Sequence, residues 1–342
     1  MKIFFYNKGP KNLGTQRIYI KNLSKWLKAK TKLITIGKSL KKGPKVFIMS
    51  KYCSHQDIIK AKSFGNSIVG LIHPSDFSEY EILKLNAADF LIVGSIEEKT
   101  YYQTYKKNVF RFPQIENYNL KCKKHLKKKK IIIGYHGNLE NLNHSNQNYK
   151  IAIEKLSKKF SLEFWAIYDT SLGKWKNQPN VKTKTFHWSE KNLKKFLKNI
   201  DIGIVPSTNK FFLDKDQLQS SLLLKTFKKF SDKIGRNNDY ILKFKNNANA
   251  GRSYLFHQAG IPVVADFWPS HFEILSDEEC GFLAHSTNSW FYSLEALSKS
   301  HFLRKKISIN ALKKFSSLYK REKWISSLYN QIKKLYYEKY VS

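Results

Sequence analysis

Short apolar runs alternate with amphipathic stretches along the first 115 residues of the chain. Residues 17–29 place Leu23 and Leu27 on one face at helical spacing. The runs at 67–73 and 89–93 are almost continuously apolar, which is typical of strands buried on both faces. Strict alternation of strands and helices predicts a parallel sheet covered by helices. The expected strands of this first series are residues 2–6, 33–36, 45–49, 67–73, 89–93 and 109–112.

A second alternating series begins near residue 130. Residues 208–238 interrupt its rhythm with a polar loop and a Lys-rich helical stretch, so we interpret them as an insertion. Residues 288–340 are predicted to be helical, with Leu328 and Ile332 on one face. The expected strands of the second series are residues 130–134, 162–168, 181–185, 201–205, 240–244, 260–266 and 282–284.

These two series predict an α/β protein of two domains. We expect an N-terminal Rossmann-like domain over residues 1–119 and a C-terminal one over residues 131–314. A terminal helix over residues 315–342 is expected to cross back to the first domain. Residues 120–130 have little apolar content and a dense run of charges. A solvated basic linker is the favoured interpretation of this segment, and a phosphate or lipid anchor is the alternative.

Composition adds a strong positive charge to this picture. The chain has 62 Lys and Arg against 26 Asp and Glu, a formal net charge of +36. Such a balance predicts attraction of phosphates, anionic lipid or nucleic acid. The chain is also rich in Lys, Asn, Ile, Tyr and Phe, an amino-acid composition typical of AT-rich genomes, and this weakens the inference from charge. Three widely spaced cysteines indicate neither a disulfide framework nor a metal cluster. With no apolar run near the ~20 residues of a membrane helix, we expect a cytoplasmic protein, with peripheral contact at the inner membrane face.

Ligands of open parallel sheets bind at the carboxyl ends of the strands. Gly134, His136, Gly137 and Asn138 follow the first strand of the second domain. A loop of this kind lets backbone N–H groups approach a phosphate, and an ordinary turn is the alternative. The loop does not match GxGxxG and the chain has no GxxxxGK[ST] motif, so neither a dinucleotide-binding fingerprint nor a P-loop is indicated.

The densest group of candidate residues precedes the GIPVV run of the second domain. Lys243 and Lys245 end an expected strand, a polar loop with Asn249 follows, and Arg252 and Ser253 open a helix. Two lysines, an arginine and the positive end of a helix dipole suit a diphosphate leaving group. The alternative is that Arg252 pairs with an acid and only fixes the loop.

This segment resembles the donor-binding region of nucleotide-sugar glycosyltransferases of the GT-B fold, especially the retaining family four. Residues 186–207 resemble the segment that precedes it in that family, and residues 72–77 and 87–95 resemble strands of the family's acceptor domain. The resemblance therefore spans nearly the whole chain. The matching residues of the donor region are Arg252, Gly260, Pro262, Val263, Val264, Glu273 and Gly281.

The resemblance implies two Rossmann-like domains that face each other across a cleft. It implies a hexosyltransferase-like enzyme that moves a sugar from a nucleotide-sugar donor to a glycan or lipid-linked acceptor, with retention and without a metal ion. The nucleotide sugar would be a substrate, and no cofactor is expected. The residues expected to carry catalysis are His73, Lys245 and Arg252. Those expected to bind the donor are His136, Gly137, Asn138, Lys243, Asn249, Ser253 and Glu273.

One departure from the family bears on activity. Many members carry two glutamates separated by seven residues, and here Asn247 and Leu255 occupy those positions. Glu273 is the candidate to take over one of their contacts to the donor. A catalytically inactive nucleotide binder therefore stays an alternative, as does a basic nucleic-acid-binding protein, although the lysines are spread along the chain and no recognition module is present. Asp214 and Asp216 are interpreted as part of a solvated loop, and no metal site is expected.

Overall fold

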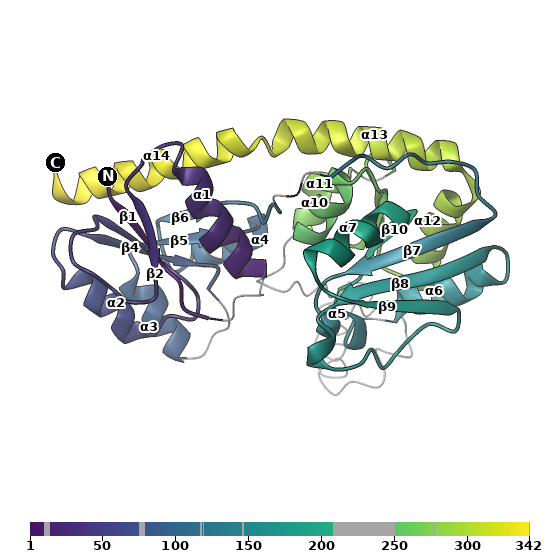
Figure 1. Cartoon of the computed structure of the whole chain (residues 1–342), viewed down its shortest axis with the longest axis horizontal. Coiled ribbons are helices and arrows are strands. Elements are labelled where there is room, and N and C mark those ends of the chain that lie inside the picture. Colours follow the sequence, from purple (N-terminus) through teal and green to yellow (C-terminus); the bar gives the residue numbers. More distant parts are fainter. Residues whose placement is uncertain are drawn as a thin grey trace, which may run out of the picture. The chain divides into compact units, whose positions relative to one another are not determined.

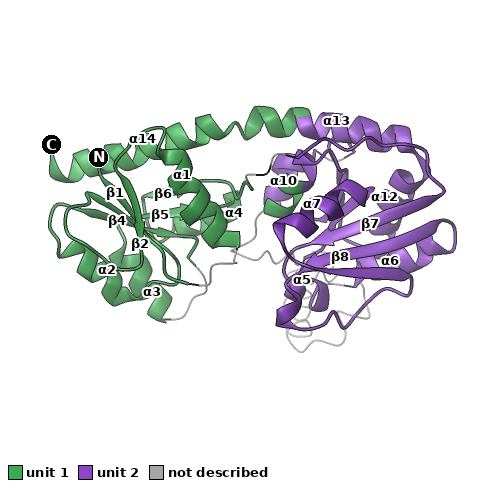
Figure 2. Ribbon diagram, in the orientation of Figure 1, with its two compact units in different colours: residues 1–119, 246–255, 313–342 green, residues 120–245, 256–312 purple. Residues whose placement is uncertain are grey.

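The computed structural model describes residues 1–9, 14–74, 79–116, 118, 120–145, 147–207, 250–276 and 278–341. Contacts divide the chain into two compact units, which are coloured separately in Figure 2. Unit 1 comprises residues 1–119, 246–255 and 313–342, and unit 2 comprises residues 120–245 and 256–312. Each unit is built around one parallel sheet (Figure 1).

The sheet of unit 1 has six parallel strands in the order β2-β1-β3-β4-β5-β6. Strands β1, β3, β4 and β5 are buried along their whole length, as their continuous apolar sequences predict. The strands are β1 (Ile3–Tyr6), β2 (Ile34–Gly37), β3 (Val46–Met49), β4 (Ile68–Ile72), β5 (Phe90–Val93) and β6 (Val109–Arg111). The helical elements between them are a π-helix (Gln16–Asn22), α1 (Leu23–Leu27), α2 (His55–Lys62), α3 (Glu79–Ala87) and α4 (Ile96–Tyr102).

The sheet of unit 2 also has six parallel strands, in the order β12-β11-β10-β7-β8-β9. They are β7 (Lys130–His136), β8 (Ser161–Tyr168), β9 (Lys182–His187), β10 (Ile202–Val205), β11 (Val263–Asp266) and β12 (Phe282–Ala284). The helical elements are α5 (Leu139–Asn143), α6 (Asn148–Ser157), a 3-10 turn (Thr170–Leu172), α7 (Glu190–Asn199), α11 (Pro269–Leu275) and α12 (Thr287–Lys299). Helix α10 (Gly251–Gln258) is divided between the units, with residues 251–255 in unit 1 and residues 256–258 in unit 2. Helices α6 and α12 pack on each other and on one face of this sheet.

Two long helices end the chain, α13 (His301–Leu318) and α14 (Arg321–Tyr340). The inward face of α14 carries Ile325, Leu328 and Ile332 into the apolar core of the first sheet, beside residues of β1, β3 and α1. At its end, the Lys339 ammonium lies 2.7 Å from Asp89. The predicted α/β class, with two parallel helix-covered sheets and a helical C-terminal tail, is confirmed. Within the described residues, the structure has no helix with the length and apolarity that crossing a bilayer requires.

The prediction that residues 120–130 form a solvated linker is wrong for part of this segment. Lys123 donates its backbone N–H to Ala259 O at 2.9 Å, and the side chain of His125 is buried with Nε2 2.8 Å from Gly260 O. Lys123 and Lys128 both pair with the buried Asp201 carboxylate. Burial lowers the pKa of Lys123 to about 8. The dense charge run concealed this packing because its few buried side chains are themselves polar.

Candidate functional site

The strand order of unit 2 reverses between β7 and β10. Strands β8 and β9 follow on one side of that point, and β11 and β12 follow on the other. Ligands of open parallel sheets bind outside the carboxyl ends of the strands at such a reversal. Gly134 of β7 pairs with Gly203 of β10. The loop after β7 therefore leaves the sheet at the position where a ligand is expected.

This loop is a capped turn. Gly137 has φ +147°, and its N–H is donated to Ile167 O at 3.2 Å. The Asn138 side chain caps α5 by accepting the Glu140 N–H at 3.2 Å. The Gly137 N–H and the Asn138 side chain were both predicted to bind the donor. Each of them is therefore engaged in a hydrogen bond within the protein.

Gly134 has a packing reason to be glycine. A Cβ at this position would lie 2.6 Å from an Ile200 methyl group and 2.8 Å from the ring of Phe196. Phe196 belongs to α7, and Ile200 follows directly after that helix. The absent side chain thus allows α7 to lie close to β7, so this glycine serves the fold.

His136 and α10 are brought together by an aromatic contact. The His136 ring, largely buried at the end of β7, lies 4.7 Å from the Phe256 ring in an edge-to-face arrangement. Phe256 is in α10, the helix that Arg252 and Ser253 open. Arg252 is half-buried, whereas the Ser253 side chain is fully buried and its hydroxyl has no hydrogen-bond partner among the described residues.

Leu255 occupies the position at which the resembled family carries its second glutamate. It is 1% exposed and packs within the core. A carboxylate contact to a donor is therefore absent at this position. Glu273, in α11, is half-buried. Four residues singled out from the sequence lie outside the described residues, namely Lys243, Lys245, Asn247 and Asn249, as do the acidic pair Asp214 and Asp216 and the stretch 208–238 interpreted as an insertion.

A fully buried aspartate organises the same edge of the sheet and escaped the sequence analysis. Asp266 ends β11, and its two carboxylate oxygens accept the Ser207 N–H at 2.5 Å and the Trp290 indole N–H at 3.1 Å. Its backbone oxygen lies 2.7 Å from His271 Nδ1. These bonds fix the start of the loop after β10. The sequence signal was an acid ending a continuous apolar run, where burial demands hydrogen-bond partners.

His73 of unit 1 follows β4 directly and has φ +43°, a left-handed conformation that is uncommon for a residue other than glycine. It is 7% exposed, and its Nδ1 lies 2.6 Å from Glu98 Oε1. Its ring stacks on Tyr19, with ring centroids 6.2 Å apart. Burial, followed by the negative charge of Glu98, raises the pKa of the Tyr19 hydroxyl well above its usual range. The sequence singled out His73, whereas Glu98 and Tyr19 were missed as its partners.

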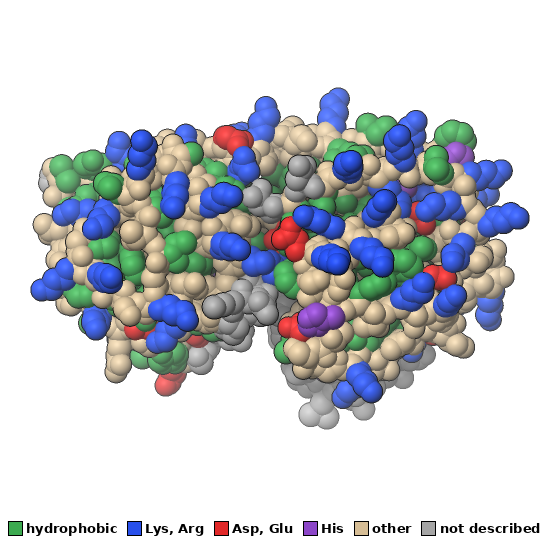
Figure 3. Space-filling view, in the orientation of Figure 1, with side chains coloured by type: hydrophobic (Ala, Val, Ile, Leu, Met, Phe, Trp, Pro, Cys, Tyr) green, Lys and Arg blue, Asp and Glu red, His purple; other side chains and the backbone are tan. Residues whose placement is uncertain are grey.

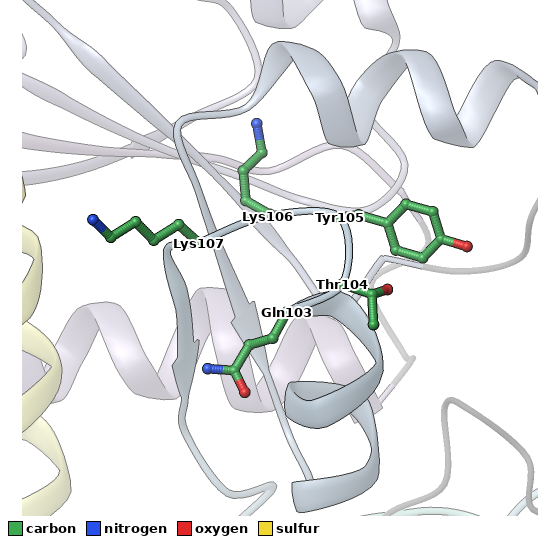
Figure 4. Close-up of a pocket in the computed structure, with 5 residues that line it drawn as sticks. All are labelled: Gln103, Thr104, Tyr105, Lys106 and Lys107. Atoms are coloured by element: carbon green, nitrogen blue, oxygen red, sulfur yellow. The ribbon is translucent and has the colours of Figure 1, made fainter.

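A shallow cavity of about 430 Å³ lies elsewhere on unit 1 (Figure 4). It is lined by five consecutive residues, Gln103 to Lys107, which follow α4. Their side chains point away from one another, so they form no convergent group of ligands. No residue singled out from the sequence lines this cavity. Across the described part of the chain, no group of three or more His, Cys, Asp or Glu side chains is placed to hold a metal ion.

Comparison with known proteins identifies relatives by structure only. No protein-family model matches the chain, and no curated protein matches its sequence. The structure is similar to sucrose-phosphate synthase from Thermosynechococcus elongatus, with a TM-score of 0.66 and 12% identity over 98% of this chain and 99% of that one.

Two further structures are similar to this chain. One was solved with a nucleotide and a sugar, and the other is a glycosyltransferase. HepE from Anabaena, solved with UDP and glucose, gives a TM-score of 0.64 at 12% identity over 98% of this chain and 100% of that one. A glycosyltransferase from Rickettsia africae gives 0.61 at 12% identity, over 98% of both chains. At this level of identity the likeness establishes a shared fold, which is the two-domain α/β architecture of GT-B glycosyltransferases.

Proposed function

We propose that this protein is a glycosyltransferase that moves a sugar from a nucleotide-sugar donor to a hydroxyl group of a glycan or lipid-linked acceptor. The proposal rests on one local observation together with the fold. The fully buried Ser253 hydroxyl, which has no partner among the described residues, lies in the first turn of α10 beside Arg252. A buried polar group left unpaired costs about 1–3 kcal/mol. A phosphate oxygen bound at this helix start would remove that cost.

The chemistry required of the donor site is stabilisation of growing negative charge. Breaking the anomeric C–O bond leaves an oxocarbenium-like sugar and places charge on the departing diphosphate. The N–H groups at the start of α10, the Ser253 hydroxyl and the Arg252 guanidinium are suited to stabilise that charge. Lys243, Lys245 and Asn249 precede α10 in the chain and are proposed to complete the group, with Glu273 contacting the donor. Protein groups of this kind are proposed to do so without a metal ion.

The stereochemical outcome is proposed to be retention, as the resemblance to family four implies. The acceptor hydroxyl would then attack from the side of the leaving group, and the diphosphate would help to take its proton. His73 is proposed to orient the acceptor or the transferring sugar by a hydrogen bond. HepE, which shares the fold, was solved with UDP and glucose. UDP and UDP-glucose are therefore the first ligands to test.

The decisive experiment combines ligand binding with turnover. Nucleoside diphosphates and nucleotide sugars are screened for thermal stabilisation, where a ligand at 100 times its Kd adds about 2.7 kcal/mol. For the ligand that stabilises the protein, we expect Arg252→Ala to lower transfer by the equivalent of about 2–4 kcal/mol, because a charge-assisted contact to the departing diphosphate is lost.

Lys305→Ala is the matched control, because it removes an exposed cation from α13. It should change neither binding nor transfer. The proposed function is wrong if no nucleotide or nucleotide sugar stabilises the protein. The assignment of the donor site is wrong if Arg252→Ala binds and turns over its donor as the wild type does.

A lipid-linked acceptor would bring the protein to a cytoplasmic membrane face. Lys and Arg side chains are distributed across the face shown in Figure 3. Each basic residue near an anionic surface contributes about 1 kcal/mol to binding. We expect more protein to sediment with anionic than with neutral lipid vesicles at moderate salt, and equal sedimentation would contradict a membrane role.

Nucleic-acid binding is a weaker candidate. On the face shown, the basic side chains are scattered and do not follow a single groove or stripe (Figure 3). Steeply salt-dependent binding of RNA or DNA, without any effect of nucleotide sugars, would favour it over transfer.

A further inference from the structure

Glu98 is a buried carboxylate with two distinct tasks. It is fully buried, and its Oε2 accepts the backbone N–H groups of Gly94 at 2.5 Å and Ser95 at 3.1 Å. The Ser95 hydroxyl accepts the Glu98 N–H in return, which completes a capping box at the start of α4. Capping uses one oxygen only. The second oxygen, Oε1, faces His73 Nδ1 at 2.6 Å.

A second capping box in unit 1 shows what capping alone requires. At the start of α2, Asp57 accepts the Ser54 N–H at 2.7 Å, and its side chain is 17% exposed. Its other contacts are to Lys8 and to the Tyr6 hydroxyl near the surface. Glu98 makes the same cap without exposure to solvent and without a Lys or Arg partner among the described residues. Burying a carboxylate this deeply is costly unless it is paired, and His73 is the group that faces it.

His73 is also fixed by two further contacts. Its backbone N–H is donated to Ile92 O at 2.7 Å, and its ring stacks on Tyr19. The Tyr19 hydroxyl donates to Phe112 O at 2.9 Å, so this ring is fixed as well. A left-handed backbone is strained for a residue with a Cβ. A strand end that needed only this conformation would be satisfied by glycine.

We propose that Glu98 is a positioning residue that holds His73 as the tautomer with its proton on Nδ1. The carboxylate charge 2.6 Å from Nδ1 favours the proton on this nitrogen, which leaves Nε2 as a hydrogen-bond acceptor. An acceptor nitrogen in this position fits a sugar hydroxyl, whose O–H is the donor. This inference rests on the proposed glycosyl transfer for its substrate, but the tautomer is a property of the unliganded protein.

Glu98→Gln tests the proposal because glutamine has one acceptor and one donor group. The Gly94 and Ser95 N–H groups require the amide oxygen, so the amide NH₂ must face His73 and donate to Nδ1. The proton of the imidazole then moves to Nε2. We expect ¹⁵N NMR of the histidine ring to show Nδ1–H in the wild type and Nε2–H in Glu98→Gln. For transfer, we expect kcat to fall about tenfold or more while the donor KM changes less than about twofold.

Asp57→Asn is the control, since it makes the same change in the other capping box. It should alter neither the His73 tautomer nor turnover. The wild-type spectrum needs no variant to fold, and a proton on Nε2 there would overturn the proposal. A Glu98→Gln protein with an inverted tautomer and unchanged kcat would also overturn it. A wild type that transfers no sugar but shows the expected tautomers would support the positioning of His73 and count against the proposed function.

Discussion

Burial changes the protonation of individual side chains in the segment 120–130. The Nε2–H of His125 is donated to Gly260 O at 2.8 Å, and burial lowers the pKa of this imidazole to about 4. The hydrogen bond to Gly260 opposes this shift, and the nearby Arg304 cation adds to it. A neutral imidazole is therefore part of the native packing at neutral pH.

This pKa predicts a loss of stability in acid. An unfolded histidine has a pKa near ~6.5, so between about pH 6.5 and the folded value the unfolded chain binds more protons, and stability falls as the pH falls. From pH 7 to pH 5 the wild type should lose about 2 kcal/mol more of its unfolding free energy than His125→Gln. Urea unfolding of both proteins at the two pH values measures this difference. Equal losses would show that His125 titrates normally in the folded state.

At the scale of elements, the turn from α10 to β11 connects the helix of the candidate donor site to its sheet. Gly260 has φ +67°, and its oxygen accepts the Ser308 hydroxyl at 2.7 Å. A Cβ at this position would overlap Cys122 Sγ and would lie 3.2 Å from the Lys123 nitrogen. The glycine of the GIPVV run is thus required by backbone conformation and by the segment that packs over it.

Gly260→Ala should therefore destabilise the protein by more than backbone strain alone. Strain of a left-handed alanine costs roughly 1 kcal/mol, and the overlap with Cys122 should bring the total to about 2–4 kcal/mol. Gly65→Ala is the control, because Gly65 has φ +75° and no atom within 4 Å of a Cβ. Chemical denaturation of both variants gives the comparison. If they lose the same free energy, residues 120–123 do not pack on this turn as described.

At the scale of the whole molecule, both ends of the chain build unit 1. Strand β1 lies inside its sheet, and α14 supplies Leu328 and Ile332 to the same core. Trp324 of α14 lies under the Arg111 guanidinium, 5.4 Å from the ring centroid. The core of the first unit is therefore completed by a helix that follows the second unit in the chain.

Leu328→Ala should weaken unit 1 strongly, because it leaves a cavity in a core that the chain end completes. The side chain is fully buried, and truncations of this kind cost about 2–5 kcal/mol. Tyr337→Ala, on the 44% exposed tyrosine of the same helix, should cost less than about 1 kcal/mol. Hydrogen exchange in β1 and β3 reports the effect on unit 1. Similar protection in both variants would mean that α14 contributes little to this core.

The candidate site was accessible to sequence reasoning only in part. His73 and His136 were found because a polar residue at the end of an apolar strand is conspicuous. Glu98 was missed as the partner of His73, since its spacing from Ser95 accounts for one of its oxygens and says nothing about the other. Asp266 was overlooked because its partners, Ser207 and Trp290, are distant in sequence.

Hydrophobic periodicity by itself determined the alternating strands and helices, the parallel sheets and the helical tail, because it records which side of each element is buried. The tertiary structure alone decided which distant groups meet. It placed Glu98 against His73, packed Lys123 and His125 over the α10–β11 turn, and gave Gly134 a role beneath α7. Hydrogen bonds and ion pairs between distant residues leave no periodic trace in a sequence, since either partner alone is also compatible with a solvated surface.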